Sequence, residues 1–285
     1  MTTAFLIFFA LALEYIYDPI SNMKDTFVID SAFSKYQNQI KDYKFDKITV
    51  LMLFPIMVIL IFTIIDYFLY NFIHPFFSFL LGLIALLYCL KPSEFNQKLE
   101  NLKFAIENNK DLDESKRFEY ILFVEKNEGP ISIISNIFYN SIRNIFSVIF
   151  VFLLLCPSGC LAYVILDNYI YSYINKEEKK SKKFIKLVIS LIEYLPVRIC
   201  AFTFAVVANF ELCMNKWRTL KVQKEFYVSN INLINSVGIA SFGNEDGEKE
   251  NNENEMITYA QSIISRSLLA WLSIVGFLII SGVFM

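Results

Sequence analysis

The sequence predicts an all-α polytopic membrane protein, and its composition and the lengths of its apolar runs lead to this fold class. Hydrophobic residues make up 55% of the 285 residues, phenylalanine occurs 29 times, and the mean hydropathy is +0.46. Several apolar runs approach the roughly 20 residues that a helix needs to cross the hydrocarbon core of a bilayer. We therefore expect about five or six membrane-embedded helical segments, including a short helical hairpin and a proline-kinked helix, within a single domain of residues 1–285.

Two clear spans and a first helix are expected before residue 91. Residues 1–17 have no basic start and no small-residue cleavage site, so we expect a retained helix rather than a signal peptide. Residues 48–70 and 73–90 form the clearest pair of spans. His74, the only histidine, lies in the turn between them, where such a residue is more often an interfacial turn residue than a metal ligand.

Residues 91–142 are amphipathic, which favours a helical insertion on the cytoplasmic side. Apolar residues recur here at helical spacing in two groups, Phe95, Leu99, Leu102 and Ile106, then Phe118, Ile121 and Leu122. Such stripes are typical of helices that lie against protein or a membrane surface, with their charges on a solvated face.

Residues 145–173 are apolar over about 29 residues, which is too long for one ordinary span. Pro157 and Gly159 interrupt this run near its middle. A helical hairpin of two short arms fits the pattern, with its tip at 156–160 and Asp167 within the second arm.

The apolar segment 184–210 contains an acid, a proline and an arginine, at Glu193, Pro196 and Arg198. A Glu or Arg at the centre of a spanning helix costs roughly 2.5–3.5 kcal/mol, so each needs a partner, a water-filled cavity or a route to the interface. Pro196 lacks an N–H, which predicts that the helix kinks or restarts here. Glu193 and Arg198 are not an i,i+4 pair, so we expect their partners on other segments. The segment either crosses the membrane or re-enters it from one side.

Charge clusters predict the topology and a flexible loop. Six lysines in 176–186 and five in 18–47 mark these two loops, together with 91–142, as cytoplasmic under the positive-inside rule. Residues 243–255 carry six acids among Asn and Gly, which predicts an acidic flexible loop before a last span at 263–284.

The residues around Pro196 resemble the signature of a known family. The order acid, aromatic, aliphatic, Pro, Val, Arg at 193–198, followed by an alanine-containing apolar helix, is similar to AmpE-type inner-membrane proteins. Their larger relatives, the CobD/CbiB adenosylcobinamide-phosphate synthases, have a Pro-Ala-Arg version. Glu14 resembles the acidic residue of the family's first helix, Asp30 belongs to what resembles its next aromatic and acidic element, and 156–163 resembles its Gly/Pro turn and tyrosine helix.

The resemblance implies a multi-pass regulatory protein of the bacterial inner membrane, linked to β-lactamase induction, peptidoglycan recycling and hence antibiotic resistance. The alternative is a membrane amide synthase, because the related synthases join an amino-alcohol phosphate to a corrinoid carboxylate with ATP and Mg²⁺. Asp167 matches at most one of two polar positions that follow the hairpin tyrosine in the synthases, and Ile170 stands at the other. This departure favours the regulatory interpretation over the synthase.

Carboxylates in or near the membrane, together with one arginine, form the predicted site. Its members are Glu14, Asp30, Asp167, Glu193, Pro196 and Arg198. Arg198 either clamps a small anionic ligand, such as a nucleotide or a muropeptide, or locks helices by pairing with Glu14 or Asp167. If the acids converge, a hard cation such as Mg²⁺ would balance their charge.

Several function classes have no support in the sequence. It contains no P-loop, no Ser/His/Asp set, no Cys/His cluster and no Rossmann fingerprint, so we assign no catalytic residue and lean against an enzyme. The composition favours the lipid bilayer as partner, and no nucleic-acid partner is expected. A transporter would show an internal repeat, and none is found.

Reporter fusions test the predicted topology. Fusions placed within 18–47, 91–142 and 175–186 should all report the cytoplasm, because lysine-rich loops remain on that side of the membrane. A periplasmic signal from the fusion at 175–186 would overturn this topology.

Overall fold

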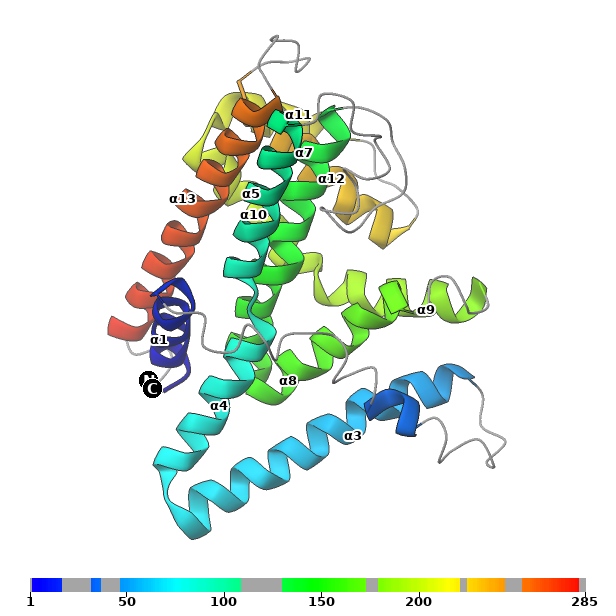
Figure 1. Cartoon of the computed structure of the whole chain (residues 1–285), viewed down its shortest axis with the longest axis vertical. Coiled ribbons are helices and arrows are strands. Elements are labelled where there is room, and N and C mark those ends of the chain that lie inside the picture. The colour runs from blue at the N-terminus through cyan, green and yellow to red at the C-terminus, as the bar shows by residue number, and fades with distance from the viewer. Residues whose placement is uncertain are drawn as a thin grey trace. The chain divides into compact units, whose positions relative to one another are not determined.

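The computed structural model describes residues 2–16, 32–36, 47–108, 130–172, 179–220, 225–243 and 253–281. Nearly all of these residues are helical and no strand occurs among them, so the all-α fold class is confirmed (Figure 1). By its backbone contacts the chain divides into two compact units, each made of two stretches. Unit 1 comprises Met1–Lys91 with Val148–Ile189, and unit 2 comprises Pro92–Ser147 with Ser190–Met285.

Unit 1 contains the two spans predicted before residue 91. They are α3 (Lys47–Phe68) and α4 (Pro75–Cys89), which Figure 1 shows as an open V. A five-residue π-helix, η2 (Leu69–Ile73), extends α3 to the turn. The first helix, α1 (Thr2–Ile16), packs against α4. The expected order of helices is therefore observed in this part of the chain.

The turn between α3 and α4 is formed by His74. Its Nδ1 atom accepts a hydrogen bond from the N–H of Phe76 at 3.1 Å, and Pro75 occupies the first helical position, where a missing N–H costs little. On the facing sides of the V, the hydroxyl of Ser78 donates to the carboxylate of Asp66 at 2.6 Å. The prediction that His74 is a turn residue is confirmed.

Four helices among the described residues are long and apolar enough to cross a membrane, and they lie within Ile48–Ile73, Pro75–Asn108, Ile133–Ile170 and Glu253–Phe277. A broken pair of helices, Lys180–Ile192 with Tyr194–Val207, adds a fifth if it forms one span. Only 17% of the apolar window of Ile48–Ile73 is buried within the protein, so lipid must cover most of this helix. The chain is thus a polytopic membrane protein.

The predicted hairpin tip lies inside α8 (Ser147–Ser172), where Cys156 breaks the helix with φ 59° and ψ −172°. A proline follows, which disfavours the helical region at this position. The thiol of Cys160 donates to the carbonyl oxygen of Val148 at 3.2 Å, although a straight helix would separate these residues by about 18 Å. The chain therefore folds back, and the hairpin expected within 145–173 is confirmed.

Unit 2 is a helical bundle in which α10 has the most neighbours. Its elements are α5 (Pro92–Asn108), α7 (Pro130–Ser141), the π-helix η3 (Ile142–Phe146), α10 (Tyr194–Val207), α11 (Phe210–Thr219), α12 (Phe226–Ala240) and α13 (Glu253–Ile280). Helix α10 packs against η3, α11, α12 and α13, while α7 packs against α12 and α13.

Aromatic side chains fill the centre of unit 2. The ring of Phe204 lies 5.2 Å from that of Phe138 and 6.2 Å from that of Phe146, and Phe146 in turn meets Trp271 at 5.2 Å. Gly238 allows α12 to approach α7, since a Cβ there would lie 2.5 Å from the ring of Phe138. These contacts connect α7, η3, α10, α12 and α13 in one core.

The outer helices of unit 2 differ in part from the prediction. The first stripe expected in the insertion 91–142 is confirmed, because its members Phe95, Leu99 and Leu102 are buried in α5. The second stripe, at 118–122, lies outside the described residues. Helix α13 begins at Glu253 rather than at 263, so the end of the expected loop 243–255 is helical, and 244–252 lies outside the described residues.

Replacing Cys156 with glycine should stabilise the hairpin turn. The backbone conformation of Cys156 is sparsely populated by residues with a Cβ, at a cost of roughly 1–3 kcal/mol, and glycine adopts it freely. We expect Cys156→Gly to raise the melting temperature of the detergent-purified protein, while Cys156→Ala retains the Cβ and should change it little. A lower melting temperature for the glycine variant would contradict a strained turn.

Candidate functional site

The stretch predicted to kink is a helix break centred on Glu193. Helix α9 (Lys179–Ile192) ends just before this residue, α10 begins just after it, and Glu193 is the N-cap residue of α10. Pro196 is the third residue of α10, where an N–H would have no partner within the helix, so its missing N–H costs little. A restart was predicted at Pro196, and the structure has it two residues earlier, at Tyr194, with a bend of 53° between the two helices.

Glu193 is fully buried and lies among polar groups of α7 and η3. Its Oε1 atom forms an ion pair with Nε of Arg143 at 3.7 Å, and the hydroxyl of Tyr139 donates to Oε2 at 3.3 Å. The guanidinium of Arg143 also lies 5.6 Å from the centre of the Tyr139 ring, within the range of a cation–π contact. The buried carboxylate thus has its partners on other segments, as expected.

Arg143 belongs to a stripe of buried polar residues, which we call the polar stripe. Asn136, Asn140, Arg143 and Ser147 are at most 4% exposed and follow one another at spacings of four, three and four residues. This spacing places them on one helical face. The stripe runs through η3, and π-helical turns are rare and frequently mark functional sites. Polar groups here therefore face the protein interior and not lipid.

Arg198 has neutral partners. Its Nη1 atom donates to the carbonyl oxygen of Tyr194 at 2.9 Å and to Oδ1 of Asn230 at 3.1 Å. The guanidinium carbon lies 3.3 Å from the centre of the Tyr194 ring. The side chain is half-buried, and within the described part of the chain it contacts no carboxylate and its Nε and Nη2 atoms make no hydrogen bond. One edge of this guanidinium is therefore open.

Asn230 connects Arg198 to the end of α9. Its Nδ2 atom donates to the carbonyl oxygen of Ser190 at 2.9 Å, while its Oδ1 atom accepts the bond from Arg198. The carbonyl of Ser190 lies in the last turn of α9, whose final residue is Ile192. Asn230, only 1% exposed, thus bonds the backbone at the end of α9 and orients the arginine.

The two charges of the predicted motif lie in the same unit, and the structure describes contacts of each with different helices. Glu193 contacts α7 and η3, whereas Arg198 contacts α12. Pro196 lies between them in the sequence. It is buried in the first turn of α10.

The other predicted site residues lie elsewhere in the chain. Glu14 is buried in α1 and Asp167 is half-buried in α8, and both belong to unit 1. Their pairing with Arg198 stays a prediction. Asp30 lies outside the described residues.

No group of three His, Cys, Asp or Glu side chains in the described ranges is arranged to hold a metal ion. Cys89, Cys160, Cys200 and Cys213 are buried, while Cys156 is exposed. Burial raises the pKa of the Cys213 thiol to about 11, partly offset by its hydrogen bond with the backbone at Asn209, so this thiol stays protonated at neutral pH.

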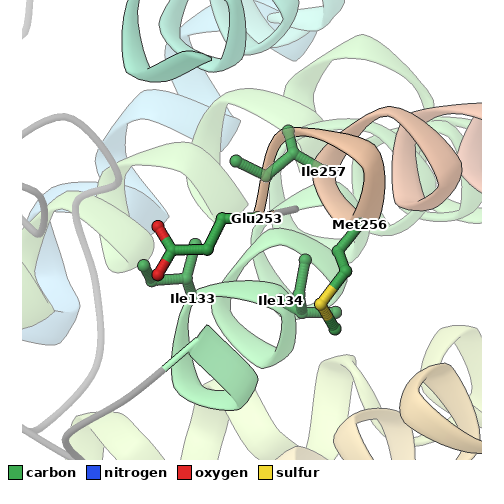
Figure 2. A pocket seen from close by; sticks show the side chains of 5 residues that line it. All are labelled: Ile133, Ile134, Glu253, Met256 and Ile257. Carbon is green, nitrogen blue, oxygen red and sulfur yellow. The ribbon is translucent and has the colours of Figure 1, made fainter. Parts of the chain in front are cut away.

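A depression of about 170 Å³ lies between α7 and α13, lined by Ile133, Ile134, Glu253, Met256 and Ile257 (Figure 2). It has no room for a sphere the size of a water molecule, and its walls are apolar except for the carboxylate of Glu253. This depression is not a candidate ligand site.

The predicted site did not include Tyr139, Arg143 or Asn230, which contact its charged residues in the structure. For Arg143 a signal was present, because the polar stripe to which it belongs recurs at helical spacing at the start of an otherwise apolar run. For Asn230 the signal was weak, since an asparagine in an apolar helix does not indicate which distant groups it bonds.

Comparison of the chain with protein-family models, with curated proteins and with solved structures finds no match.

The ion pair between Arg143 and Glu193 can be tested with a double-mutant cycle. Removing Arg143 alone, as Arg143→Met, should destabilise the protein by about 3–5 kcal/mol, because the buried carboxylate loses its counter-charge. Adding Glu193→Gln should then cost less than the sum of the two single changes. Melting temperatures in detergent measure this, with Arg266→Met on the exposed side of α13 as the matched control. Strict additivity would mean that the two side chains are not coupled.

Proposed function

We propose that this chain is a membrane-bound regulatory protein of the AmpE type, which binds a small anionic ligand at Arg198. In this proposal it resides in the bacterial inner membrane and contributes to β-lactamase induction and peptidoglycan recycling. The resemblance of residues 193–198 to AmpE-type proteins supports the biological role, and the surroundings of Arg198 support the binding of an anion.

The observation that carries the proposal is the open edge of Arg198. A guanidinium inside an apolar helix is costly, and it is usually balanced by a carboxylate. Arg198 contacts none among the described residues and is held by a carbonyl, an amide and an aromatic ring instead. Its positive charge therefore remains available to a ligand.

The geometry of the open edge suits a phosphate or a carboxylate. Nε and Nη2 are the two donors that bind such groups through parallel hydrogen bonds, and this bidentate arrangement is both stronger and more selective than a contact with lysine. Nucleotides and muropeptides, the ligands expected from the resemblance, both carry these groups. Nη1 meanwhile remains engaged with Tyr194 and Asn230, which holds the plane of the guanidinium in place.

Asn230 links ligand binding to the helix break. The same amide group binds Arg198 on one side and the carbonyl oxygen of Ser190 on the other. A ligand bound at Nε and Nη2 would fix the guanidinium, and through it the Asn230 amide that bonds the end of α9. Such binding is a signal when the ligand has different affinities for the fixed and the free arrangement of these groups.

Thermal melting of the detergent-purified protein tests the proposal. We expect an anionic compound from a panel of nucleotides, muropeptides and corrinoids to stabilise the protein, by about 2.7 kcal/mol at a concentration 100 times its Kd. The variant Arg198→Gln retains a donor for Asn230 but loses the charge, so the stabilisation should disappear. Arg218→Gln, on the exposed side of α11, is the matched control and should respond like the unchanged protein.

Two outcomes would count against this function. Stabilisation by no anion, or equal stabilisation of the Arg198→Gln variant, would exclude Arg198 as the binding residue. ATP hydrolysis that requires Mg²⁺ and is stimulated by a corrinoid would instead favour the amide synthase alternative.

A further inference from the structure

The exposed face of α10 contains Arg198 and otherwise only apolar side chains. Leu195, Ile199, Phe202 and Val206 are 53%, 39%, 50% and 58% exposed. Arg198 comes three residues after Leu195 and four before Phe202, so it lies on the same face of the helix. In a polytopic membrane protein, such a face is covered by acyl chains. A ligand that reaches the open edge of Arg198 from this side therefore meets an apolar surface as well.

The guanidinium lies at the end of this apolar face. Arg198 extends back toward the start of α10, because its Nη1 atom bonds the carbonyl oxygen of Tyr194, the first residue of the helix. Long basic side chains in membranes reach in this way toward the interface. Tyr194 itself is 37% exposed and packs against the ring of Phe226, which is 50% exposed. Aromatic side chains of this kind are typical of the headgroup level of a bilayer.

The length of the apolar face matches one leaflet. From Tyr194 to Val206 a regular helix rises by about 18 Å, close to half of a hydrocarbon core of about 30 Å. A lipid lying along α10 would thus place its acyl chains against Leu195, Phe202 and Val206 and its headgroup at Arg198.

We propose that the anion bound by Arg198 is the phosphate of an anionic membrane phospholipid, whose acyl chains cover the exposed face of α10. This inference rests on the proposed function, because it assumes that Arg198 binds an anion, and it adds the class of ligand. The phosphodiester oxygens accept hydrogen bonds from Nε and Nη2, and the single negative charge of the phosphate balances the guanidinium. The headgroup then acts on the bond between Asn230 and Ser190 at the end of α9.

Nanodiscs of defined composition test whether Arg198 binds an anionic phospholipid. The protein is reconstituted in phosphatidylcholine alone and in phosphatidylcholine with phosphatidylglycerol, and its melting temperature is measured together with the lipids that it retains in native mass spectrometry. We expect phosphatidylglycerol to raise the melting temperature and to be retained. Arg198→Gln should weaken this retention roughly tenfold, as loss of a charged bidentate contact predicts. Arg198→Lys keeps the charge but loses the two parallel donors of the guanidinium. Its lipid retention should lie between that of the unchanged protein and that of Arg198→Gln.

Controls separate this site from general attraction to basic residues. Arg218→Gln and Arg266→Gln remove exposed arginines of α11 and α13 and should leave lipid retention unchanged. Equal retention of phosphatidylglycerol by the unchanged protein and by both Arg198 variants would overturn the inference, since the lysines near α9 would then explain the binding. Circular dichroism and gel filtration confirm that each variant is folded.

A parallel experiment with soluble anions distinguishes the phospholipid inference from the proposed function. Inorganic phosphate and ATP with Mg²⁺ are added to the protein in phosphatidylcholine nanodiscs. Stabilisation that depends on Arg198 and occurs only with the soluble anions would overturn the phospholipid inference and retain the proposed function. If replacing Arg198 changes neither the response to phosphatidylglycerol nor the response to the soluble anions, both the phospholipid inference and the proposed function are overturned.

Discussion

A buried carboxylate at the break between α9 and α10 is the constraint on which unit 2 depends. Glu193 is 0% exposed, and an uncompensated carboxylate in such a place carries a desolvation penalty of several kcal/mol. Arg143 supplies the opposite charge from η3, and Tyr139 supplies a hydrogen bond from α7. Apolar packing alone allows many arrangements of neighbouring helices. The ion pair requires that the polar stripe of α7 and η3 faces the start of α10.

The same break creates the second polar site of unit 2. Helix α9 ends before Glu193, and Asn230 of α12 bonds the carbonyl oxygen of Ser190 in its last turn. The other end of that amide holds Arg198. The restart of α10 at Tyr194 and one buried asparagine thus determine where the guanidinium lies.

Glu193 and Arg198, the two charges of the motif, differ in burial and in the partners that they contact. Glu193 is enclosed and paired with a cation, so its contribution is to the packing of helices. Arg198 is half-buried, rests on an aromatic ring and lies on a face of α10 that is otherwise apolar and exposed. The enclosed acid and the half-buried arginine thus lie within five residues of each other, and Asn230 connects the arginine to the backbone of α9.

By itself the sequence determined the all-α membrane class, the spans α3 and α4, the turn at His74, the hairpin break at Cys156 and the helix restart near Pro196. These features depend on hydropathy and on backbone chemistry within a few residues, which a sequence displays directly. Only the tertiary structure decided that Glu193 pairs with Arg143 and that Arg198 bonds Asn230. The physical reason is that a buried charge demands some partner, but which of several distant polar residues comes within reach depends on how helices pack, and apolar side chains with similar hydropathy do not specify this locally.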